Sequence, residues 1–138
     1  MLQGLQKALK YNPDNVLVLN NWAYFLSLEG KQLEQALKMA ERVTELTDRN
    51  PTYMDTQAWI LFKLGRLEEA RQLMRQAVAL DGQKSRELLL HYGDILHALG
   101  EQFMAETYWK KALDKGYDKA VIEERMQRPK VEKKSEQK

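Results

Sequence analysis

A glycine returns every 35 residues along this 138-residue chain, at Gly30, Gly65 and Gly100. Each glycine stands in the same surroundings, because a small residue lies seven positions before it and an alanine lies five or six positions after it. The small residues are Ala23, Ala58 and Gly93, and the alanines are Ala36, Ala70 and Ala105. A fixed period of this length predicts an array of repeats, each packed on its neighbours. Such arrays hold partners more often than they catalyse reactions.

Helical periodicity surrounds each glycine. Apolar residues recur at spacings of three and four, as in Leu19, Trp22, Phe25 and Leu26 before Gly30, and Leu33, Ala36, Leu37 and Ala40 after it. We therefore expect each repeat to be a first helix (helix A), a tight glycine turn and a second helix (helix B). The glycine ends helix A because it adopts the left-handed conformation without a Cβ penalty. The alanines let the two helices approach closely.

The repeat frame divides the chain into an all-α array of antiparallel helix pairs. Residues 2–11 match the frame of helix B with no helix A before them, which indicates a fragment or a truncated end of a longer array. Three full repeats follow, and then a short helix that caps the last apolar face. The polar, basic end of the chain is expected to be disordered. The expected ranges are 2–11 for the incomplete repeat, 14–47, 51–80 and 84–115 for the repeats, 118–127 for the capping helix and 128–138 for the tail.

Charge and composition exclude several kinds of function. The net charge is +2, and residues 128–138 hold five basic and two acidic side chains, so the rest of the chain carries −1. A nearly neutral body argues against a dedicated nucleic-acid surface. No cysteine is present, and no glycine-rich phosphate loop or Ser–His–Asp arrangement is visible. We therefore expect no catalytic residue, no cofactor and no membrane span, since no apolar run approaches ~20 residues.

The glycine frames resemble the tetratricopeptide repeat. The closest stretch is Ala58-Trp59-Ile60-Leu61-Phe62-Lys63-Leu64-Gly65-Arg66-Leu67-Glu68-Glu69-Ala70, and Leu19–Leu26 and His91–Leu96 are looser matches. The resemblance covers residues 2–116, although the trailing proline is kept only as Pro13 and Gln57 replaces an apolar residue. It implies a right-handed superhelix of helix pairs. More particularly, the chain resembles the C-terminal repeats of longer bacterial tetratricopeptide proteins, some of them cell-envelope lipoproteins. This resemblance allows either a periplasmic or a cytoplasmic location.

The resemblance also implies where a partner binds, because these arrays usually hold an extended peptide or a helix on the concave face lined by the A helices. By the family frame, the outward positions are Asn20, Tyr24, Ser27, Asp55, Trp59, Phe62, Leu90, Asp94 and His97, with His91 nearby. We take as peptide-binding candidates Asn20, Tyr24, Asp55, Trp59, His91 and Asp94. Tyr24 and Trp59 hold the same frame position, where two rings can grip peptide side chains or can instead pack on the neighbouring helix.

Two other kinds of site are rejected. The clamp that some family members use for the C-terminal carboxylate of chaperones would fall on Asn20, Tyr24, Thr56, Glu87 and His91, which lack the basic pair and include a repelling Glu87. His91, Asp94 and His97 are spaced by three and three, which spreads them over about 120° of a helix, and no other histidine exists to complete a metal site.

The sequence therefore predicts a protein–protein interaction scaffold with an unidentified protein or peptide partner. The alternative is that these repeats only extend a longer array or mediate self-association and hold no ligand of their own. The incomplete first repeat favours this alternative, because its apolar residues Leu2, Leu5 and Leu9 can pack on a missing helix or on another copy.

Overall fold

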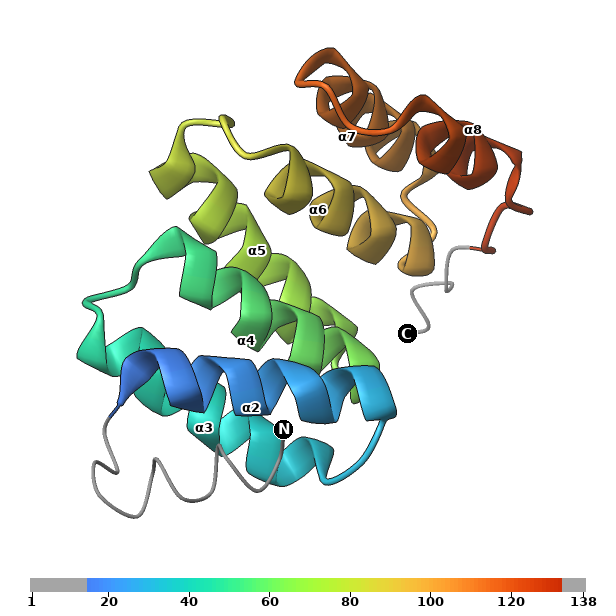
Figure 1. Ribbon diagram of the computed structural model, residues 1–138. Helices are drawn as coiled ribbons and strands as arrows, with labels where there is room; N and C mark the ends of the chain where they lie inside the picture. The colour runs from blue at the N-terminus through green and yellow to red at the C-terminus, as the bar shows by residue number, and fades with distance from the viewer. Residues whose placement is uncertain (1–14, 133–138) are drawn as a thin grey trace, which may run out of the picture. The chain divides into compact units, whose positions relative to one another are not determined.

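The computed structural model describes residues 15–132, which form helices and no strand (Figure 1). The chain divides into two compact units, Met1–Arg66 and Leu67–Lys138, and each is described by itself. The first unit holds α2 (Val16–Glu29), α3 (Leu33–Leu46) and α4 (Pro51–Lys63). The second holds α5 (Leu67–Asp81), α6 (Arg86–Ala98), α7 (Gln102–Asp114) and α8 (Lys119–Gln127). The helix expected over residues 2–11 lies outside the described residues, as does the end of the tail from residue 133.

Four helices begin in the same way, with a polar side chain that accepts a hydrogen bond from a backbone N–H of the first turn. The caps are Asn15 for α2, Asn50 for α4, Ser85 for α6 and Asp118 for α8. Each cap satisfies a donor that the helix itself leaves unpaired. We count positions in an A helix from its cap, so position 4 is Leu19, Met54, Leu89 and Ile122, and all four side chains are buried. The last described helix, α8, therefore repeats the start of an A helix.

The glycine that defines the repeat ends each A helix as predicted. Gly30, Gly65 and Gly100 have φ angles of 67°, 80° and 82°, in the left-handed region. In each turn the glycine N–H and the next N–H bond back to carbonyl oxygens of the last helical turn, with the second bond running from Lys31 to Leu26 in the first repeat. This pair of bonds is the Schellman arrangement, which requires a left-handed residue. The first turn has one more residue than the others, and Gln32 takes a left-handed φ of 50° there.

The core of the first unit lies where α2 and α3 pack on each other and on α4. Small residues at position 8 of the A helices, Ala23 and Ala58, are fully buried. Small side chains at these points permit close helix approach, as the sequence predicts. The other buried apolar side chains of this unit are Leu19, Leu26, Ala36, Leu37, Ala40, Val43, Met54, Ile60 and Leu61.

The second unit packs α6 against both α5 and α7, with α8 on α7. Its centre is Trp109, whose side chain is fully buried. A Cβ atom built on Gly93 would lie 2.5 Å from Trp109 Cδ1. Position 8 is therefore glycine in this repeat, rather than alanine, because the indole ring occupies the space that a methyl group would need.

Candidate functional site

Tyr24, at position 9 of α2, is the most open of the predicted contact residues, with 44% of its surface exposed. The exposed residues of this helix are Leu17, Asn21, Tyr24, Leu28 and Glu29. The outward line expected from the family frame, Asn20, Tyr24 and Ser27, is therefore right only for Tyr24. Ser27 is buried, and its hydroxyl donates to the Tyr24 carbonyl oxygen at 2.6 Å.

Trp59 holds position 9 of α4, in the same unit as Tyr24, and is half-buried. Its ring lies 4.8 Å from that of Phe62, centroid to centroid, and Lys63 Nζ lies 5.5 Å from its centroid. The ring thus packs on side chains of its own helix and also keeps part of its surface open. The packing interpretation therefore describes part of the environment of Trp59, and its role as a contact residue stays a prediction.

Two polar candidates stand at position 5 of the same two helices. Asn20 of α2 is half-buried, and within residues 15–132 its Oδ1 is a buried acceptor with no donor. Asp55 of α4 is half-buried too. Because α2 packs on α4, the first unit presents a polar residue and an aromatic residue in the same order on two neighbouring helices.

Position 9 of the third repeat is closed. Asp94 lies there, and its side chain is only 4% exposed. Trp109 Nε1 donates to Asp94 Oδ1 at 2.9 Å, and Arg125 of α8 donates from Nε to Oδ1 at 2.8 Å and from Nη2 to Oδ2 at 3.1 Å. The expectation that Asp94 faces outward is wrong, because α8 supplies a cation that pairs with it.

Two more expected outward positions of α6, Leu90 and His97, are also buried. The His97 ring lies 5.4 Å from the Trp109 ring, and its Nδ1 is 3.1 Å from Gln102 Oε1. His91 is half-buried. The outward positions expected on α6, Leu90, Asp94 and His97, are thus all buried. Tyr24, the one exposed candidate, lies in the first unit.

Arg125 is a residue that sequence reasoning missed. It stands at position 7 of the A-helix frame, which Trp22, Gln57 and Tyr92 hold in the other helices. The guanidinium is partly buried, which disfavours the charged form, but the hydrogen bonds and charge of Asp94 outweigh this and raise the pKa of Arg125. Position 9 is aromatic in the first two repeats and a carboxylate, Asp94, in the third, and Arg125 follows 31 residues later. This combination is the sequence signal for the ion pair.

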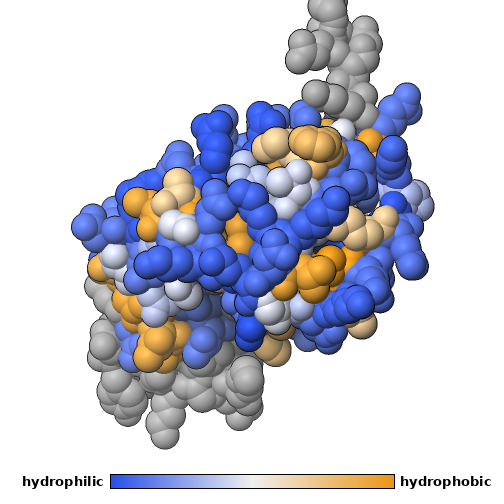
Figure 2. Space-filling view, turned by 90° about the horizontal axis from the view of Figure 1, so that it is seen from above, coloured by the Kyte–Doolittle hydropathy of each residue, from blue (hydrophilic) through white to orange (hydrophobic). Residues whose placement is uncertain are grey.

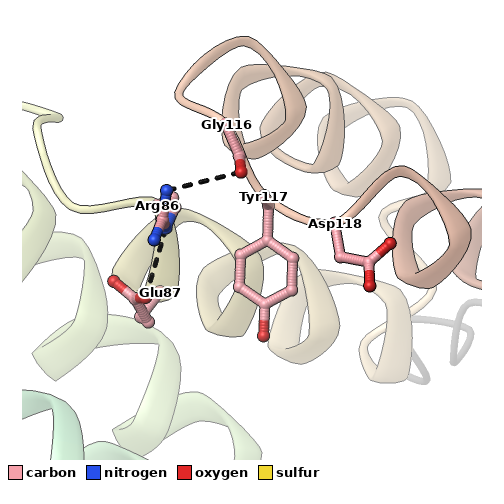
Figure 3. Close-up of a pocket in the computed structure, with 5 residues that line it drawn as sticks. All are labelled: Arg86, Glu87, Gly116, Tyr117 and Asp118. Carbon is pink, nitrogen blue, oxygen red and sulfur yellow. Dashed lines mark hydrogen bonds and ion pairs between the residues drawn. The ribbon is translucent and has the colours of Figure 1, made fainter.

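A shallow depression in the second unit lies between the start of α6 and the loop that leads into α8 (Figure 3). Arg86 and Glu87 line it from α6, and Gly116, Tyr117 and Asp118 line it from the loop. Arg86 Nη1 donates to the Gly116 carbonyl oxygen at 3.4 Å, and Arg86 Nε lies 3.5 Å from Glu87 Oε2. These contacts join the two segments. No nucleophile with an adjacent base lines this depression, so it offers no catalytic arrangement.

Two pKa shifts in the second unit also follow from packing. Burial, together with the neighbouring Tyr108 hydroxyl, raises the pKa of Tyr92, whose ring meets that of Tyr108 edge-on with centroids 4.6 Å apart. On the exposed side of α8, hydrogen bonds from Arg128 and Arg125 lower the pKa of Glu124. Within residues 15–132, no three His, Asp or Glu side chains are grouped as metal ligands. The same range holds no helix with the length and hydropathy to cross a membrane.

Comparison with known proteins agrees with this architecture. A family model described as tetratricopeptide repeat matches residues 51–84. The TPR repeat-containing protein PA4667 of Pseudomonas aeruginosa is 29% identical over 94 residues, which is 68% of this chain and 16% of that protein. Residues 51–84 thus match one tetratricopeptide repeat, and the chain as a whole is similar to proteins that contain such repeats. It spans about a sixth of the length of this curated relative.

Solved tetratricopeptide structures show the same fold. A crystal structure of MamA superposes with a TM-score of 0.73 at 15% identity, covering 90% of this chain and 71% of that one. A structure of pilF from Pseudomonas aeruginosa gives a TM-score of 0.71 at 21% identity, covering 87% and 54%. Proteins with tetratricopeptide repeats generally mediate protein–protein interactions and are typically non-enzymatic scaffolds.

Proposed function

We propose that this chain binds a peptide or helix of a protein partner on the A-helix face of its first unit, with Tyr24 and Trp59 as the main contacts. The observation that carries the proposal is that both rings stand at position 9 of their helices, Tyr24 on α2 and Trp59 on α4. The two helices pack on each other. Tyr24 is exposed and Trp59 is half-buried. Aromatic side chains supply large contact area while losing little conformational entropy.

The polar residues beside the rings support the same surface. Asn20 precedes Tyr24 by four residues, as Asp55 precedes Trp59, so each pair lies on one side of its helix. A buried acceptor that lacks a donor costs free energy. Within residues 15–132 Asn20 Oδ1 is such a buried acceptor and is closed to a partner, so a contact from Asn20 uses the exposed remainder of its half-buried side chain.

The binding surface is preformed. Glycine turns and capped helices fix α2 and α4, so a partner loses little free energy to ordering of the scaffold. The conformational entropy lost on binding is therefore mainly that of the partner, whether it binds as an extended peptide or as a helix. His91 and the buried Asp94 belong to the second unit and are not needed by the surface proposed here.

The third repeat favours a structural role for its own A helix. Position 9 is occupied there by the Asp94–Arg125 pair, and α8 covers it. We infer that the third A helix serves the packing of the second unit, whereas the first unit holds the ligand.

Affinity capture from the native lysate tests the proposal. The bait is the 138-residue chain, compared with a Tyr24→Ala/Trp59→Ala variant whose folding is checked by circular dichroism and urea denaturation. The matched control is Phe103→Ala, which removes an aromatic side chain that is 81% exposed on the B helix α7. A partner retained by the wild type and Phe103→Ala and lost by the double variant supports the A-helix face. Equal capture by all three chains overturns it.

A further inference from the structure

The hydroxyl of Tyr92, at position 7 of α6, is an unpaired donor at the end of a buried side chain. Tyr92 is only 4% exposed, and within residues 15–132 its hydroxyl makes no hydrogen bond. The hydroxyl still reaches the surface, because it is not among the enclosed side-chain atoms without a partner in that range, Asn20 Oδ1, Trp22 Nε1, Thr44 Oγ1 and Gln57 Oε1. A phenol donates one hydrogen bond, so this group is placed to donate to a ligand.

Three helices of the second unit meet around this hydroxyl. Helix α6 packs against both α5 and α7, whereas these two helices, each described in full, do not pack on each other. The Tyr108 ring of α7 meets the Tyr92 ring edge-on, with centroids 4.6 Å apart. Lys111 Nζ of α7 donates to Gln83 Oε1 at 2.9 Å, which joins α7 to the loop that follows α5. Side chains of both α5 and α7 can therefore reach the tyrosine pair.

Cations approach the tyrosine pair from both helices. Burial and the neighbouring Tyr108 raise the pKa of Tyr92, and the charges of Arg75 and Arg71 of α5 oppose this rise. Both guanidinium groups therefore lie within electrostatic range of the Tyr92 hydroxyl. On α7, Lys111 Nζ lies 5.0 Å from the centroid of the Tyr108 ring. Three positive charges thus gather around two hydroxyl groups.

Carboxylates neutralise these cations only in part. Glu68 pairs with Arg71 at 2.8 Å. Arg75 Nη2 and Lys111 Nζ instead donate to neutral amide oxygens of glutamine side chains, at 2.7 and 2.9 Å. Arg75 and Lys111 therefore have no carboxylate partner within residues 15–132. Unpaired cations beside unpaired hydroxyl donors favour an anionic ligand.

The positions of the cations favour several anionic groups over a single one. Arg75 and Lys111 stand on two helices that α6 separates, so one compact anion does not match both as well as a segment with several carboxylates does. On the face of the molecule in Figure 2, hydrophobic side chains form separate small areas within a mostly hydrophilic surface, so charge is the better guide to an occupant.

We call Arg75, Tyr92, Tyr108 and Lys111 the tyrosine site. We propose that the tyrosine site binds the carboxylates of an acidic segment of a partner protein. The two cations pair with carboxylates through charge-assisted hydrogen bonds, and the two hydroxyl groups add donors. The site belongs wholly to the second unit and shares no residue with the surface proposed around Tyr24 on the first.

Fluorescence anisotropy with labelled octaglutamate in low-salt buffer tests the tyrosine site, with octaglutamine as the neutral peptide of equal length. We expect octaglutamate to bind and octaglutamine not to bind, with an affinity that falls as salt is added. An Arg75→Gln/Lys111→Gln variant should bind octaglutamate roughly tenfold more weakly or worse. The control Lys38→Gln/Lys110→Gln removes two exposed charges from α3 and from another side of α7, and should bind like the wild type.

Tyr92→Phe isolates the hydroxyl, because it keeps the ring that packs on Tyr108. We expect this variant to fold and to bind octaglutamate several-fold more weakly. In nitrogen-15 NMR spectra of the wild-type chain, octaglutamate should shift the amide signals around residues 75, 92 and 111. Equal affinity of the wild type and the Arg75→Gln/Lys111→Gln variant overturns the site, and so does octaglutamine binding as tightly as octaglutamate.

Two further outcomes separate this proposal from its neighbours. If inorganic phosphate shifts the same amide signals and octaglutamate does not, the ligand is a phosphate group and the acidic segment is overturned. The Tyr24→Ala/Trp59→Ala variant should bind octaglutamate like the wild type. Failure of the tyrosine site therefore leaves the proposed surface of the first unit standing.

Discussion

Arg125 and Asp94 form a two-point ion pair across 31 residues, with nitrogen–oxygen distances of 2.8 and 3.1 Å. The same carboxylate accepts a hydrogen bond from Trp109, so three helices of the second unit meet at one buried group. Because α8 supplies the arginine, this pair links α8, which packs on α7, to α6 as well. The relationship explains why the third repeat has a carboxylate where the first two repeats have aromatic rings.

Replacing Asp94 by alanine leaves the Trp109 N–H without an acceptor and Arg125 without its partner. We expect the free energy of unfolding to fall by about 3 kcal/mol, which urea denaturation measures. Arg125→Met keeps an apolar stem but also breaks the pair, and the double variant should lose less than the sum of the two. The control Glu68→Gln breaks only the exposed pair with Arg71 and should change stability by less than ~0.5 kcal/mol. Additive losses would contradict the coupling.

Gly93→Ala should destabilise the protein although alanine favours helices. A Cβ at this position would lie 2.5 Å from Trp109, so we expect a loss of about 1–3 kcal/mol. The second repeat offers the matched rescue, because it has Ala58 at position 8 and Met74 where the third has Trp109. Adding Trp109→Met to Gly93→Ala should cost less than the two separate losses together. A neutral or stabilising Gly93→Ala would show that the ring can move away.

Tyr92 makes stability depend on alkaline pH. Burial raises its pKa above the ordinary value, so the folded state holds the phenolic proton more tightly than the unfolded state does. This stabilisation is fully present below the unfolded pKa of about 10 and is lost as pH rises through the folded pKa. The urea midpoint of wild type should therefore fall more between pH 9 and 11 than that of Tyr92→Phe. Equal falls in the two chains would exclude Tyr92 as the group responsible.

Gln32→Gly should stabilise the first unit. Gln32 adopts a left-handed φ of 50°, a conformation that costs a residue with a Cβ roughly 1–2 kcal/mol. Glycine removes this cost but adds unfolded-state entropy, so we expect a net gain of about 0.5–1 kcal/mol in thermal or urea unfolding. Lys38→Gly, at an exposed interior position of α3, is the control and should be destabilising by about the same amount. Destabilisation by Gln32→Gly would contradict the backbone conformation.

Much of the fold can be predicted from the sequence, because each repeat needs the same residue types at the same positions and the pattern therefore recurs. Gly30, Gly65 and Gly100 each end a helix in the left-handed region, as their period predicts. Ala23 and Ala58 are fully buried where the frame requires small residues. A constraint that recurs in register is readable from one sequence.

The candidate site was only partly predictable, because exposure at a given frame position depends on what packs over it. Asp94 was expected to face outward by analogy with Tyr24 and Trp59, but Arg125 of α8 covers it.

Site-specific photo-crosslinking tests most directly the claim that a partner binds the A-helix face of the first unit. A photoreactive phenylalanine analogue replaces Tyr24 or Trp59 in turn, and Gln72 on the exposed side of α5 serves as the control position. After irradiation in lysate, we expect one protein to be attached at positions 24 and 59 and not at 72, at a level that added unlabelled wild-type chain reduces. Attachment of a partner at position 72 and at neither 24 nor 59 would contradict the account.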